Sequence, residues 1–189
     1  MAFLRENPNK PDHIVTCLRT EYGKLHIMKV LGVYETGFTL IFIPLLTLSA
    51  DVLAKFESTN QQHGKVRVFH LDELHGADRA KYRAFLSLCV STKRSCQDTN
   101  FVFLSPQFLI NHPDALKALL CAAGQRTLRL VIIDEAHLHV QHGESFCQEC
   151  RTLTKCWFAP IFHPPNGQSF VRLFVTSATL PHSYVRSLS

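Results

Sequence analysis

Six short apolar runs alternate along the chain with longer segments of helical periodicity. The runs are rich in Val, Ile and Phe and lack strict apolar–polar alternation, which is typical of strands that are covered on both faces. They are HIVTCL (13–18), FTLIFIP (38–44), VRVFH (66–70), FVFLS (101–105), LRLVIID (128–134) and VRLFVTS (171–177). We therefore predict six strands, most of them buried in the middle of the domain.

Three of the segments between these runs have apolar positions spaced by about 3.6 residues, as an amphipathic helix requires. They are LTLSADVLAKF (46–56), ADRAKYRAFLSLCV (77–90) and DALKALLCAAG (114–124). The last of them follows Pro113, offers Asp114 as a cap and closes at Gly124. Alternating strands and helices predict an α/β fold with a mostly parallel sheet and helices on both faces.

Acidic residues follow the fifth apolar run directly. Asp134 and Glu135 come after LVII, and His137 lies two places further on. Burying carboxylates is costly unless another group pairs with them or coordinates them. Because ligands of such sheets gather at the carboxyl ends of the strands, we expect these side chains to face a ligand. An ordinary strand that ends in acids near a helix is the simpler alternative.

Composition narrows the class of protein only slightly. With 189 residues, 46% of them hydrophobic and 19% charged, the chain is long enough for one domain with a full core. The formal charge of +5 is spread along the chain and permits, without requiring, contact with nucleic acid. Seven cysteines in mostly apolar surroundings, and no leader or membrane-length apolar run, predict an intracellular protein, nuclear or cytoplasmic.

A second motif follows on the next strand, where FVTSATL places Ser177, Ala178 and Thr179 at its end. DEAH after one strand and SAT after the next resemble the corresponding motifs of superfamily 2 helicases. The stretch after the DEAH box, LHVQHGESF, is similar to the aromatic-rich loop of RecQ-like DNA helicases, with Gln141, Gly143 and Phe146 matching and His142 where an aromatic residue is usual. The chain is thus identified as a RecQ-like first motor lobe, a single RecA-like P-loop NTPase domain.

The resemblance implies a role for each matching residue. Asp134 would hold Mg²⁺ through water, Glu135 would be the general base, and His137, Gln141, Ser177 and Thr179 would couple the nucleotide to DNA. Two upstream stretches resemble the family's motifs Ia and Ib, IPLLTLSADV (43–52) and FLSPQFLI (103–110), which hold a single strand by its backbone. The nucleic-acid contacts implied in this way are Pro44, Thr47, Ser105, Gln107, His142 and Phe146. The activity implied is ATP-dependent, 3′–5′ separation of single-stranded or forked DNA.

The phosphate loop expected after the first strand is altered. In LRTEYGKLHIM, Thr20, Gly23 and Lys24 match the G-x-x-x-x-G-K-[ST] pattern as the superfamily relaxes it. Leu25 replaces the hydroxyl residue that ligates Mg²⁺, and Glu21 and Tyr22 replace small residues of the anion-binding nest. A carboxylate beside a triphosphate repels it, so we expect weak binding of ATP and Mg²⁺.

The expected organisation is an N-terminal tail, 1–12, followed by a helicase ATP-binding domain, 13–189, that stops soon after the SAT motif. A second lobe would then come from another chain, and the isolated chain is expected to be inactive. Two other interpretations stay open: a non-catalytic nucleic-acid-binding domain that has lost ATP, and a gene fragment. A weaker alternative ligand is zinc, whose candidate residues are Cys147, Cys150 and Cys156 with His137, His139 and His142 nearby.

Overall fold

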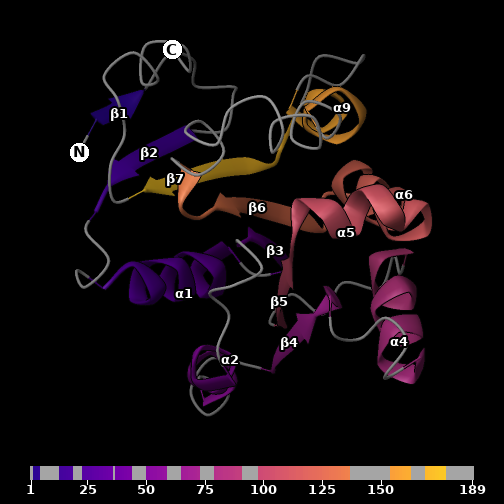
Figure 1. Cartoon of the computed structure of the whole chain (residues 1–189). Coiled ribbons are helices and arrows are strands. Elements are labelled where there is room, and N and C mark those ends of the chain that lie inside the picture. Colours follow the sequence, from indigo (N-terminus) through magenta and orange to yellow (C-terminus); the bar gives the residue numbers. More distant parts are fainter. Residues whose placement is uncertain are drawn as a thin grey trace.

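A seven-stranded sheet forms the centre of the molecule (Figure 1). The computed structural model describes residues 2–4, 13–18, 23–35, 37–43, 50–58, 65–72, 79–90, 98–136, 154–162 and 169–177. The strands are β1 (Ala2–Leu4), β2 (His13–Cys17), β3 (Gly37–Phe42), β4 (Val66–His70), β5 (Thr99–Leu104), β6 (Leu128–Ile133) and β7 (Arg172–Ser177). Their order in the sheet is β1-β2-β7-β6-β3-β5-β4.

The strands β2 to β7 are parallel, and they coincide with the six apolar runs of the sequence. Every residue of β5 is buried, and so is β3 from Phe38 to Phe42. This burial explains why the apolar runs do not alternate with polar residues. The segment that we expected to be a tail, 1–12, contributes β1, which pairs antiparallel with β2 at the edge of the sheet.

The helices are α1 (Lys24–Glu35), α2 (Ala50–Glu57), α4 (Arg79–Val90), α5 (Pro106–Asn111), α6 (Pro113–Gly124) and α9 (Ala159–Phe162), and a π-helix, Thr154–Phe158, leads into α9. The three predicted helices are confirmed as α2, α4 and α6, with ends that differ by a few residues. Asp114 is not the cap of α6. His112 takes that position, Pro113 is the first helical residue, and the Asp114 carboxylate accepts a hydrogen bond from the Tyr82 hydroxyl at 3.0 Å.

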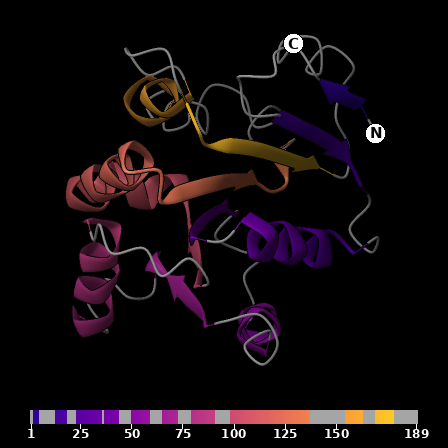
Figure 2. The same ribbon diagram turned by 180° about the vertical axis from the view of Figure 1, so that it is seen from behind.

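Helices cover both faces of the sheet, as predicted. On one face, α4, α5, α6 and α9 pack over a cluster that includes Phe42, Phe85 and Trp157. On the other face, α1 and α2 pack over Ile41 and Phe101. Figures 1 and 2 show the same division from opposite sides. Successive β3 residues point to opposite faces, so this one strand supplies both clusters.

Candidate functional site at the carboxyl ends of three strands

Three neighbouring parallel strands, β2, β7 and β6, end beside one another. Lys24 is the first residue of the helix after β2, Ser177 is the last residue of β7, and Asp134 follows the last residue of β6. Cys17 lies opposite Ser177, and the Leu18 N–H donates to the Ser177 carbonyl at 2.9 Å. The sheet therefore brings Lys24 together with Asp134 and Ser177, each of which is more than a hundred residues away from it in the sequence.

Gly23 sets the direction in which α1 starts. Its φ of 74° lies in the left-handed region, which glycine adopts without the strain that a side chain would introduce. Its carbonyl accepts from the Ile27 N–H at 3.1 Å, which is the first hydrogen bond of the helix. This turn places Lys24 at the end of α1 that faces the carboxylates.

Lys24 is the charged partner of the two acids that follow β6. Its ammonium lies 3.4 Å from Asp134 Oδ1 and still closer to Glu135 Oε1. The Lys24 side chain is 5% exposed, and those of Asp134 and Glu135 are 13% and 15% exposed. A charge of this burial is tolerated when it is paired and hydrogen-bonded. Lys24, Asp134 and Glu135 therefore form one ionic cluster, to which we refer as the lysine–carboxylate cluster.

The backbone fixes both carboxylates. The Asp134 N–H donates to the Phe42 carbonyl at 3.0 Å, and the Glu135 N–H donates to Asp134 Oδ1 at 2.8 Å. Glu135 has a φ of 48°, which costs a non-glycine residue roughly 1–2 kcal/mol. Burial raises the pKa of the Asp134 carboxyl, although Lys24 and the Glu135 N–H act to lower that pKa. Strain and a raised pKa together are typical of functional positions.

The donor set fits Mg²⁺ in part. Two adjacent carboxylates suit this ion, which proteins commonly hold through one or two carboxylates plus substrate phosphates and water. The side chain after Lys24 contributes nothing, because Leu25 packs against the apolar cluster under α1 and has no oxygen. Among the described residues, no group of three or more His, Cys, Asp or Glu side chains is placed to hold a metal ion. Within the described part of the chain, Asp134 and Glu135 are the side chains that could hold a metal ion at this site.

The motif Ib residues Ser105 and Gln107 are hydrogen-bonded to other side chains of the domain. The Ser105 hydroxyl donates to Asp72 Oδ1 at 2.5 Å and accepts from the Phe108 N–H at 3.1 Å, which caps α5. Its own N–H donates to Asp72 Oδ2 at 2.8 Å, and Ser105 is 2% exposed. Gln107 is half-buried, and its amide donates to Asn111 Oδ1 at 3.3 Å. Direct contact between the Ser105 hydroxyl and a phosphate would require these bonds to open.

Two features of the site were not anticipated from sequence. Asp72 holds Ser105 across 33 positions of the chain, a link that no local pattern signals. The aromatic ring of Phe42, whose carbonyl holds Asp134, packs edge-on against Trp157 at 5.3 Å between ring centroids. Trp157 belongs to the π-helix, and π-helical turns occur frequently at functional sites. Three aromatic residues within positions 157–162 were the available signal.

Several predicted site residues lie outside the described residues, and their positions stay predictions. They are Thr20, Glu21, Tyr22, Pro44, Thr47, His137, Gln141, His142, Phe146 and Thr179. Of the cysteines proposed as zinc ligands, only Cys156 is described. It is exposed on the π-helix, while Cys147 and Cys150 lie outside the described part of the chain.

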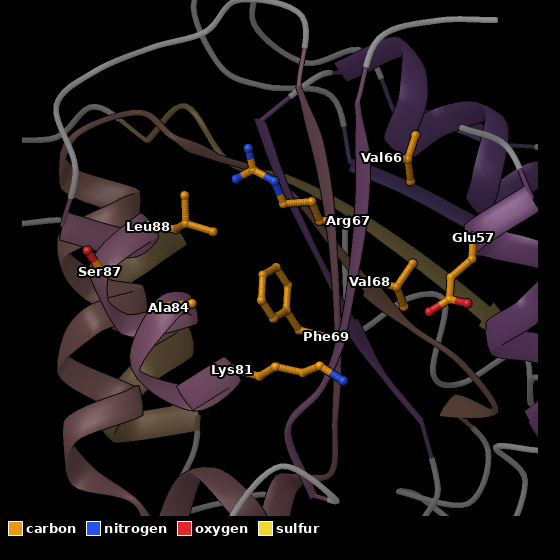
Figure 3. Close-up of a pocket in the computed structure, with 9 residues that line it drawn as sticks. All are labelled: Glu57, Val66, Arg67, Val68, Phe69, Lys81, Ala84, Ser87 and Leu88. Carbon is orange, nitrogen blue, oxygen red and sulfur yellow. The ribbon is translucent and has the colours of Figure 1, made fainter. Parts of the chain in front are cut away.

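A groove of about 720 Å³ lies at the other end of the sheet, along the edge strand β4 and between α2 and α4. Figure 3 shows Phe69 pointing from β4 toward α4, with Arg67 and Lys81 on either side of its ring. The lining residues include neither Lys24 nor the two carboxylates. This groove is therefore separate from the lysine–carboxylate cluster.

Comparisons with known proteins agree with this geometry. The sequence model of the family described as DEAD/DEAH box helicase matches residues 12–188. The crystal structure of a hypothetical ATP-dependent RNA helicase from Sulfolobus tokodaii is similar in fold, with a TM-score of 0.53 at 17% identity. The alignment covers 93% of this chain and 44% of that one, so the chain spans less than half the length of this structural relative. No curated protein matches the chain significantly.

No helix in the described part of the chain is long and apolar enough to cross a membrane.

Proposed function

Because this chain belongs to the DEAD/DEAH box helicase family, we propose that it is the first RecA-like lobe of a RecQ-like, 3′–5′ DNA helicase with a weakened nucleotide site. The observation that carries the proposal is the position of Lys24 between Asp134 and Glu135 at adjoining strand ends. A phosphate-binding lysine and a pair of adjacent acids are the groups that phosphoryl transfer from ATP requires.

Each residue of the lysine–carboxylate cluster has a task in this proposal. Lys24 binds the β- and γ-phosphates as a point charge once it leaves the carboxylates. Asp134 would hold Mg²⁺, and Glu135 would accept the proton of the attacking water. Mg²⁺, when bound, neutralises the charge that develops on the phosphate oxygens. His137 and Thr179, together with Ser177 between the two strand ends, couple these events to DNA.

Leu25 is an argument for weak nucleotide binding at this site. The residue after the lysine normally supplies a hydroxyl to Mg²⁺, whereas Leu25 is apolar and packs against the core cluster that contains Met28 of the same helix. The same observation favours a second candidate function, a nucleic-acid-binding domain that has lost ATP. The two functions differ in one measurable property, which is whether ATP binds at all.

Binding of ATP by the wild-type protein separates these two functions, and repair of the loop tests whether Lys24 belongs to a phosphate loop. The variant is Glu21→Gly, Tyr22→Ser and Leu25→Thr, and the measurement is the Mg²⁺-dependent affinity for a fluorescent ATP analogue. Restoring one metal ligand and removing one like charge is expected to raise the affinity about tenfold, which needs only about 1.4 kcal/mol. The matched control adds Lys24→Ala to the repaired loop and is expected to abolish the gain. An unchanged affinity in the folded, repaired protein would mean that Lys24 does not belong to a phosphate loop.

DNA is the proposed polymer because the stretch after the DEAH box resembles the RecQ-like loop. Its proposed contacts include Phe146, which would stack on a base, and His142. We expect weak binding of single-stranded DNA with a steep dependence on salt, because backbone contacts dominate such binding. Titration of labelled DNA and RNA oligonucleotides of one sequence, with wild type and Phe146→Ala, tests the choice. The choice of DNA would be contradicted if RNA bound more tightly. The proposed contact of Phe146 would be contradicted if Phe146→Ala left the binding of both polymers unchanged.

A further inference from the structure

The lysine–carboxylate cluster holds one positive charge against two negative ones at a site of low solvent exposure. Only 5% of the Lys24 side chain is exposed, and its ammonium contacts both carboxylates. An ammonium that lost these partners while remaining buried would be strongly destabilised. The contact with both acids is therefore a strong constraint on the position of Lys24.

We propose that Lys24 is the resident counter-cation of Asp134 and Glu135, so that a free divalent ion cannot bind these carboxylates until the lysine has been drawn away. The consequence is an order of events. A nucleotide phosphate has to attract Lys24 first, and only then do the two acids become available to a metal ion. With this order, Mg²⁺ cannot bind the two acids when no nucleotide is present.

Three features of the chain hold the cluster in this state. The N–H of Glu135 donates to Asp134 Oδ1, Glu135 has a left-handed backbone, and both acids contact the same ammonium. Gly23 begins α1 so that Lys24 points at them. Leu25, in the next position, offers no oxygen that would hold a divalent ion beside the lysine. A divalent ion must therefore compete with the ammonium for the same two side chains.

The inference rests on the proposed function only in taking Asp134 and Glu135 as the cation-binding pair. Its tests contain no nucleotide. A chain that fails to bind ATP can still pass them, and a chain that binds ATP can still fail them.

The first test is Mn²⁺ binding measured by electron paramagnetic resonance. Wild type is expected to bind Mn²⁺ weakly, whereas Lys24→Met, which keeps the length of the side chain and removes its charge, is expected to bind one ion at least tenfold more tightly. Adding Asp134→Asn to Lys24→Met should remove that gain. The matched control is Lys29→Met, since Lys29 lies on the same helix and donates to the Lys55 carbonyl instead. Equal affinity of wild type and Lys24→Met, with both folded by circular dichroism, would overturn the proposal.

The second test does not depend on the folding of a lysine variant. Native protein is treated with formaldehyde and a mild reductant, and methylation of each lysine is followed by mass spectrometry. Lys24 is expected to react at least tenfold more slowly than Lys29 in wild type, and Glu135→Gln is expected to accelerate Lys24 alone. If burial by itself protects Lys24, Glu135→Gln leaves its rate unchanged. That result would show that the carboxylates do not hold the lysine, and it would overturn the proposal.

Discussion

Gly32 lies where α1 packs closely on the sheet, and Gly32→Ala is expected to loosen that contact. A methyl group at this position would lie 2.8 Å from Phe101 Cζ, closer still to Phe101 Cε1, and 3.0 Å from Thr39 Oγ1. Phe101 and Thr39 are fully buried. The Phe101 ring is also held by Phe56, whose ring centroid is 4.7 Å away. The neighbours therefore cannot give way without moving other core residues.

The expected change in the free energy of unfolding follows from two opposing terms. Overpacking a well-packed core costs about 1–3 kcal/mol, and replacing glycine by alanine in a helix gains up to about 1 kcal/mol. We expect a net loss of about 1–2 kcal/mol, which for a domain of this size lowers the melting temperature by roughly 2–8 °C. Because α1 begins at Lys24, an outward shift of this helix should also weaken the lysine–carboxylate cluster.

Thermal and urea unfolding followed by circular dichroism measure this loss. Gly124→Ala is the matched control, since Gly124 is also helical, at the end of α6, and a methyl group there would meet nothing within 4 Å. This control should be as stable as wild type or slightly more stable. If Gly32→Ala proved as stable as Gly124→Ala, the packing of α1 against β3 and β5 would be wrong.

Two further predictions concern single side chains. Burial raises the pKa of the Cys89 thiol to about 12, so at pH 8 to 9 Cys89 should alkylate far more slowly than the exposed Cys17 and Cys156. Peptide mapping after brief iodoacetamide treatment checks this order, which would be contradicted by early labelling of Cys89. Trp157, the one tryptophan of the sequence, is 0% exposed, so the folded chain should emit at short wavelength and resist acrylamide quenching. Emission typical of a water-exposed indole would show that the π-helix does not pack on Phe42.

The periodicity of apolar residues determined most of the fold. Strand β5 is buried from end to end, and its run of Phe, Val and Leu residues predicts this burial from the sequence. Short-range signals failed where tertiary contacts overrode them. Asp114 has the chemistry of a helix cap, but Pro113 fits the first helical turn and His112 takes the capping position. The edge strand β1 was missed, because a three-residue strand gains its stability from β2 and not from its own sequence.

The residue types of the candidate site were also determined by the sequence, because DEAH and SAT follow their strands directly. The partner of each acid was decided only by the tertiary structure. Parallel strands joined through helices place β2, β7 and β6 side by side although β7 comes last in the chain, and this order carries Lys24 to Asp134 across 110 positions. The same holds for Asp72, which reaches Ser105 only because β4 and β5 are neighbours. Local patterns record burial and backbone preference, whereas the pairing of distant charges depends on how the sheet is assembled.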